Sequence, residues 1–205
     1  MFPYYQPTET ELLICDLYQT LNINHPHEID IDLISALWGA DIVYYDGRAK
    51  SYWEDLGSVI FLNKDDPPEK QRVVFFHELC HIVKHEGHQD VLPGLFVELQ
   101  ETQAYHFMLF ASMPYYLLPD PLEMIWSEYI GLLAEEFHVS LEVAAARAEQ
   151  IIARLDEEYY YHRNDIALTK SKIKIALSVH RFGRKKLSQE SEHMLRQLDN
   201  QVCSF

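Results

Sequence analysis

The pentapeptide H-E-L-C-H at residues 77–81 has the residue types and the spacing to do chemistry. It lies in an apolar run, residues 73–84, that predicts a buried helix. Because residues four apart share one face of a helix, His77 and His81 can both bind one Zn²⁺ ion while Glu78 stays close to its open side. Two neutral imidazoles, a Lewis-acidic metal and a carboxylate base are the parts needed to activate a water molecule.

A catalytic zinc ion normally has three protein ligands, so the chain must supply a third. The metzincin pattern requires glycine at position 84 and histidine at 87, but the chain has lysine and glycine there, which excludes that class. His85 continues the four-residue series, yet two helical turns place it roughly 12 Å along the axis from His77, too far for one ion to bind both. We predict a supporting or packing role for His85. On the following helix two carboxylates share a face, Glu98 and Glu101, and the pattern alone leaves both open.

The elements that must position these residues are several helices and a short β-rich region. Helices are predicted over residues 9–21, 29–37, 66–86, 96–112, 122–137 and 140–158. Asp66 is the expected cap of the helix that carries the pentapeptide. Runs of β-forming residues at 42–45 and 58–62, bounded by turn residues, predict two or three antiparallel strands. These elements indicate an α+β fold.

The composition limits the class of protein. A length of 205 residues fits one domain with an appended helical part, and a net charge of −15 argues against a surface devoted to nucleic acid. The three cysteines, Cys15, Cys80 and Cys203, are scattered and odd in number, so no disulfide framework is expected. Neither a secretory signal nor a membrane span is visible, and we expect a cytoplasmic protein that does not bind membranes.

The charge changes towards the end of the chain. Residues 163–186 hold eight Lys or Arg and one acidic residue. We interpret this segment as a solvated helix face, with docking of an acidic partner or nucleic acid as the alternative. Residues 134–154 can be drawn as a helix-turn-helix, but the second helix offers few side chains for base contacts, so direct DNA binding is not expected.

Three segments carry a resemblance to a known family. They are F-F-H-E-L-C-H-I-V-K-H at 75–85, E-T-Q-A-Y-H-F at 101–107 with Met-Pro at 113–114, and V-S at 139–140 with an arginine at 147. Over roughly residues 10 to 150 the chain resembles the ImmA/IrrE family of metallopeptidases. One departure is Cys80, where the family usually has glycine; we interpret it as a buried packing residue, with a metal-binding or oxidisable thiol as the alternative.

The resemblance implies a zincin-like core, with a small antiparallel sheet and the HExxH helix, over residues 1–135. Residues 136–205 are then a helical C-terminal extension. It also implies that Glu101 is the third ligand beside His77 and His81. The cofactor would be Zn²⁺, with Mn²⁺ as a possible substitute, and Glu78 the general base of a gluzincin-like endopeptidase.

The resemblance further implies a substrate. Family members typically cleave a helix-turn-helix transcriptional repressor and so derepress phage, mobile-element or stress genes. The alternative is a non-proteolytic zinc-containing regulator that binds a repressor or DNA, although the intact Glu78 argues against it. Tyr105, His106 and Tyr115 are nearby candidates for the oxyanion donor, and the sequence selects none of them.

Overall fold

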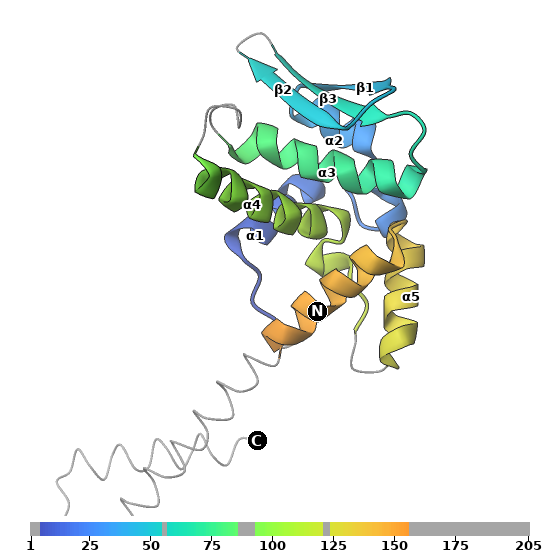
Figure 1. The fold of residues 1–205 in the computed structure, drawn as a ribbon. Coiled ribbons are helices and arrows are strands. Elements are labelled where there is room, and N and C mark those ends of the chain that lie inside the picture. The colour runs from blue at the N-terminus through green and yellow to red at the C-terminus, as the bar shows by residue number, and fades with distance from the viewer. Residues whose placement is uncertain (1–4, 55–56, 86–92, 121–123, 156–205) are drawn as a thin grey trace, which may run out of the picture. The chain divides into compact units, whose positions relative to one another are not determined.

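The computed structural model describes residues 5–54, 57–85, 93–120 and 124–155. Met1–Leu155 form one compact unit, in which the helices lie on one side of a small sheet (Figure 1). The basic segment 163–186 lies outside the described residues, and the domain boundary near residue 135 stays a prediction. In the described part of the chain, no helix combines the length and the apolar character needed to cross a membrane.

The N-terminal helices begin at well-defined caps. In α1 (Glu9–Thr20), the hydroxyl of Thr8 accepts a hydrogen bond from the backbone N–H of Glu11 at 3.2 Å. In return, the Glu11 carboxylate accepts one from the backbone N–H of Thr8 at 2.9 Å. After a short 3₁₀ turn, η1 (Pro26–Glu28), α2 (Ile31–Leu37) is capped by the side chain of Asp30. Both helices lie where the sequence predicts them.

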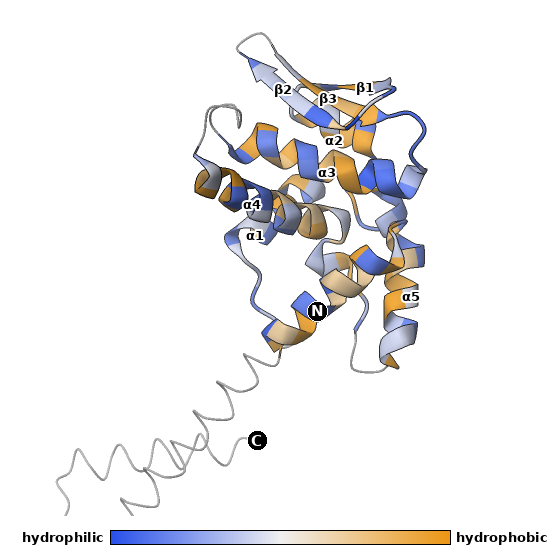
Figure 2. Cartoon of the chain, viewed as in Figure 1, coloured by the Kyte–Doolittle hydropathy of each residue, from blue (hydrophilic) through white to orange (hydrophobic). Residues whose placement is uncertain are grey.

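The sheet is mixed, and this corrects the predicted antiparallel arrangement. Its strands β1 (Ala40–Tyr45), β2 (Lys50–Glu54) and β3 (Gly57–Asn63) lie in the order β1-β3-β2. β2 pairs antiparallel with β3, whereas β1 and β3 run parallel. The chain reverses before and after β2, so β3 returns in the direction of β1. β2 was not among the predicted β-rich runs, because its residues are mostly hydrophilic (Figure 2). The α+β fold class itself is confirmed.

The helix with the pentapeptide, α3 (Pro68–Lys84), lies between the sheet and α4 (Gly94–Ser112) (Figure 1). Its apolar side chains pack with those of β3 in one core that includes the fully buried Ile60, Leu62, Phe75, Phe76 and Leu79. Asp66 does not cap the helix. The cap position is Pro67, and Asp66 instead accepts a hydrogen bond from Lys70 at 2.7 Å.

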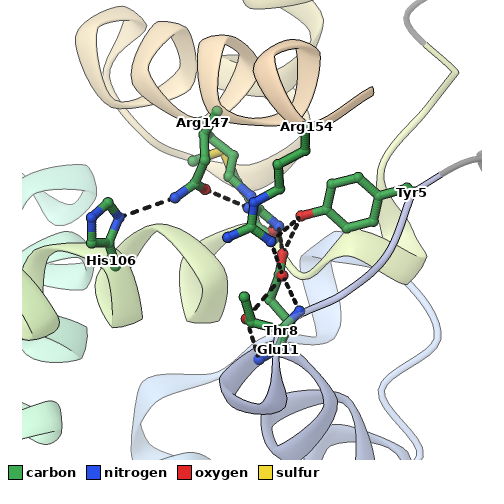
Figure 3. Close-up of polar contacts among 8 residues, drawn as sticks. Tyr5, Thr8, Glu11, His106, Arg147 and Arg154 are labelled. Atoms are coloured by element: carbon green, nitrogen blue, oxygen red, sulfur yellow. Dashed lines mark hydrogen bonds and ion pairs between the residues drawn. The ribbon is translucent and has the colours of Figure 1, made fainter. Parts of the chain in front are cut away.

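The remaining helices close the unit below α4. After η3 (Tyr115–Leu117), α5 (Trp126–Phe137) leads into a helix over residues 141–155. At the start of this last helix, the Ser140 hydroxyl accepts a hydrogen bond from the backbone N–H of Val143 at 3.3 Å. Arg147 of this last helix is buried and donates from Nε to the carbonyl of Met113 at 3.2 Å (Figure 3). The Met-Pro step and the arginine of the family pattern are therefore in contact.

Candidate metal centre

The two histidines of the pentapeptide project from one face of α3. Their side chains lie one helical turn apart, and the two Nε2 atoms are 3.3 Å from each other. His81 is buried, while the His77 side chain is partly exposed. One side of the pair is thus closed by the protein and the other can be reached from solvent.

Glu101 of α4 faces the same point. Its Oε2 lies 3.2 Å from Nε2 of His77, and its Oε1 lies 3.5 Å from Nε2 of His81. Ligand atoms 2.0–2.1 Å from a tetrahedral ion such as Zn²⁺ would be about 3.3–3.4 Å apart. The separation of the two Nε2 atoms and that of His77 Nε2 from Oε2 are close to this value, and one ligand atom of each residue lies within 4.8 Å of the others. Among the described residues, Glu98 is not part of this cluster, and the structure brings together only His77, His81 and Glu101.

Two small residues, one from each helix, lie in the core in which α3 and α4 pack together. Ala104 lies three residues after Glu101, on the same side of α4, and is fully buried. Cys80 of α3 is also fully buried, and burial raises the pKa of its thiol to about 12. A protonated thiol without solvent access fits the packing role that we predicted for Cys80.

Glu78 lies on the side of α3 that faces the sheet. The hydroxyl of Ser51, on β2, donates to Oε2 of Glu78 at 2.8 Å. Burial raises the pKa of Glu78, and the hydrogen bond from Ser51 and the charge of His77 oppose this effect only in part. Ser51 was not predicted, because its role depends on the pairing of β2 with β3, which places it opposite Ile60 on the inner face of the sheet.

His85 supports the cluster without joining it. Its Nδ1 lies 2.9 Å from Nδ1 of His81, and its Nε2 lies 3.0 Å from Oε1 of Gln103 on α4. Burial lowers the pKa of His81 to about 4 and also lowers the pKa of His85. Both rings are therefore neutral at neutral pH, which is the form in which histidine binds metals. This arrangement agrees with the supporting role predicted for His85.

The three candidates for an oxyanion donor lie in different surroundings. His106 contacts Gln150 at 3.0 Å, and the ring of Tyr115 stacks on that of Tyr5 with 5.8 Å between centroids. These contacts direct both side chains towards the Arg147 region. Tyr105 is half-exposed and lies one turn after Glu101, on the same face of α4. Of the three, Tyr105 is the one that the helix geometry places on the side of the metal cluster.

Comparisons with known proteins agree with these observations. The family model of the IrrE N-terminal-like domain, peptidase family M78, matches residues 40–149. Phage-like element PBSX protein XkdA of Bacillus subtilis (strain 168) is 33% identical over 154 residues, which cover 70% of this chain and 73% of that protein. Uncharacterized protein YqaB of the same strain is 24% identical over 157 residues, or 76% of this chain and 91% of that protein. The chain belongs to the ImmA/IrrE family of metallopeptidases.

Proposed function

We propose that the protein is a zinc-dependent endopeptidase of gluzincin type, with His77, His81 and Glu101 as metal ligands and Glu78 as general base. The observation that carries the proposal is the convergence of His77, His81 and Glu101, whose ligand atoms lie within 4.8 Å of one another, beside the partly buried Glu78. Two neutral imidazoles and one carboxylate are a ligand set of catalytic zinc sites that keep a fourth position open. Mn²⁺, which accepts carboxylate ligands, is a possible substitute.

The residues around the site would divide the work of peptide hydrolysis. A Zn²⁺ ion held there would supply Lewis acidity, which polarises the scissile carbonyl and makes a water molecule nucleophilic at neutral pH. Glu78 would take a proton from that water and return it to the leaving amine. Ser51 donates to Oε2 of Glu78 and helps to hold the carboxylate in place for this transfer. The raised pKa of Glu78 favours this role, because the acid form is needed in the second step.

The proposed substrate is a helix-turn-helix transcriptional repressor in the cytoplasm, whose cleavage would derepress phage, mobile-element or stress genes. Support comes from the family and from the relative XkdA, which is named as a protein of a phage-like element. The net charge of −15 would also favour encounter with a basic DNA-binding protein. Direct DNA binding has less support, because Arg147, the basic residue in the middle of the last described helix, is buried against Glu11.

The test combines the purified protein, Zn²⁺ and the helix-turn-helix protein encoded beside it. We expect a discrete fragment of the repressor, identified by mass spectrometry, that is absent with Glu78→Gln although this variant still holds zinc. A fragment that persists with Glu78→Gln would contradict the proposed base. If the wild type holds zinc and binds the repressor without cutting it, the non-proteolytic regulator becomes the better description.

A further inference from the structure

Three side chains form a hydrogen-bonded row that leads from the metal cluster to the surface. Nδ1 of His81 lies 2.9 Å from Nδ1 of His85, and Nε2 of His85 lies 3.0 Å from Oε1 of Gln103. The two rings are buried, with exposed fractions of 5% and 6%, whereas Gln103 is exposed on α4. The proposed mechanism gives no task to His85 or Gln103.

The contact between the two rings couples the positions of their protons. Two nitrogens at this distance need one donor and one acceptor, and a neutral imidazole has a single N–H. If His81 donates from Nδ1, its Nε2 keeps the lone pair that a metal ion needs. His85 then accepts at Nδ1 and donates from Nε2 to the oxygen of Gln103. If His85 donates from Nδ1 instead, Nε2 of His81 carries the proton and cannot bind metal. Each ring keeps one proton in both arrangements.

We propose that His85 and Gln103 are positioning residues that set the tautomer of His81, and that the amide oxygen of Gln103 selects the metal-binding tautomer. The inference rests on the proposed function in taking His81 as a ligand. A glutamine amide can present either its oxygen or its NH₂ group, and only the oxygen accepts a proton from Nε2 of His85. Groups behind metal-bound histidines commonly orient the ring in this way.

The test changes residue 103, which is exposed and therefore tolerant of substitution. Gln103→Met keeps the length and removes the acceptor, whereas Gln103→Glu is an acceptor only. We measure the Zn²⁺ dissociation constant at pH 8 by competition with a chromogenic chelator. Gln103→Met should weaken binding about tenfold, and Gln103→Glu should bind at least as tightly as the wild type. In metal-free protein, ¹⁵N NMR of the imidazoles should show more Nε2–H tautomer of His81 in Gln103→Met than in Gln103→Glu.

Thr102→Glu is the matched control, because it adds the same charge one residue away. The wild-type Thr102 hydroxyl donates to the Glu98 carbonyl at 2.8 Å and so takes no part in the row. The proposal is overturned if Thr102→Glu tightens zinc binding as much as Gln103→Glu does. It is also overturned if Gln103→Met leaves both affinity and tautomer unchanged. A wild type that binds no zinc would contradict the proposed function alone, since the tautomer of His81 in metal-free protein still tests the row.

Discussion

Arg147 and Glu11 are 136 residues apart in the sequence, yet Nη2 of Arg147 lies 2.7 Å from Oε1 of Glu11. The two side chains have exposed fractions of 0% and 1%. The Glu11 carboxylate accepts further hydrogen bonds from Tyr5, Thr8 and Arg154 (Figure 3). The Arg147 guanidinium donates further hydrogen bonds to Met113 and Gln150. A buried ion pair is stable when its remaining polar atoms are also hydrogen-bonded, and this pair joins α1, the end of α4 and the last described helix.

Replacing Arg147 by Met should lower the free energy of unfolding by about 3 kcal/mol, because the Glu11 carboxylate stays buried with Arg154 as its remaining cation. Urea unfolding measures the loss. The double variant Arg147→Met/Glu11→Leu removes both charges and should recover part of it. Lys70→Met provides the control, since Lys70 pairs with Asp66 at the surface and its removal should cost less than about 1 kcal/mol. Equal losses for Arg147→Met and Lys70→Met would contradict a stabilising role of the buried pair.

The same ion pair should make the free energy of unfolding depend on pH. Burial alone would raise the pKa of Glu11, but Arg147, the Tyr5 hydroxyl and the Thr8 amide outweigh it and lower the pKa below its usual value of 4.5. A lowered pKa contributes stability that is present above the unfolded value and lost as the pH falls through the folded one. The advantage of the wild type over Glu11→Gln in urea unfolding should therefore be constant near neutral pH and shrink below about pH 4.5. An advantage that does not change with pH would rule out this linkage.

Glu101→Ala should reduce the zinc content well below the one ion per chain that we expect for the wild type, because it removes one of three ligands. Glu98→Ala removes a carboxylate from the same helix that lies outside the cluster, and its zinc content should not change. Elemental analysis after dialysis gives both numbers. Equal loss of zinc in the two variants would mean that the general acidity of α4, rather than a specific ligand, holds the ion.

Ser51→Ala should slow repressor cleavage about tenfold while the zinc content stays the same, because it removes the hydroxyl that donates to Oε2 of Glu78 and helps to orient the carboxylate. Ser51→Thr keeps a hydroxyl on a β-branched side chain that suits a strand, and should restore most of the rate. Single-turnover cleavage assays separate this effect from substrate binding. A rate for Ser51→Ala equal to that of the wild type would remove Ser51 from the active site.

The sequence predicted those parts of the site that depend on short-range geometry. The common face of His77 and His81 follows from helical periodicity. The exclusion of His85 as a ligand of the same ion follows from the rise per residue of a helix. The choice of Glu101 over Glu98 needed the family resemblance, because helix spacing leaves both open. Local patterns of this kind also located most of the helices.

The parts that the sequence did not predict depend on long-range packing. Ser51 meets Glu78 only because β2 pairs with β3 in one register, and the polar sequence of β2 gave little sign of a strand. The parallel pairing of β1 and β3 has the same origin. Gln103 reaches His85 through the packing of α4 on α3, which no spacing within one helix can reveal.

The proposed metal ligands come from two helices, and His77 and Glu101 are 24 positions apart in the sequence. An ion bound by both residues would connect α3 and α4 in the way that a disulfide connects two segments, and would reduce the conformational entropy of the unfolded chain if it stayed bound there. If it leaves on unfolding, mass action stabilises the folded state instead, by an amount that grows with the logarithm of the free zinc concentration. In either case the catalytic centre would also be a cross-link of the fold, and a chelator would both stop the reaction and loosen the helix pair that carries it.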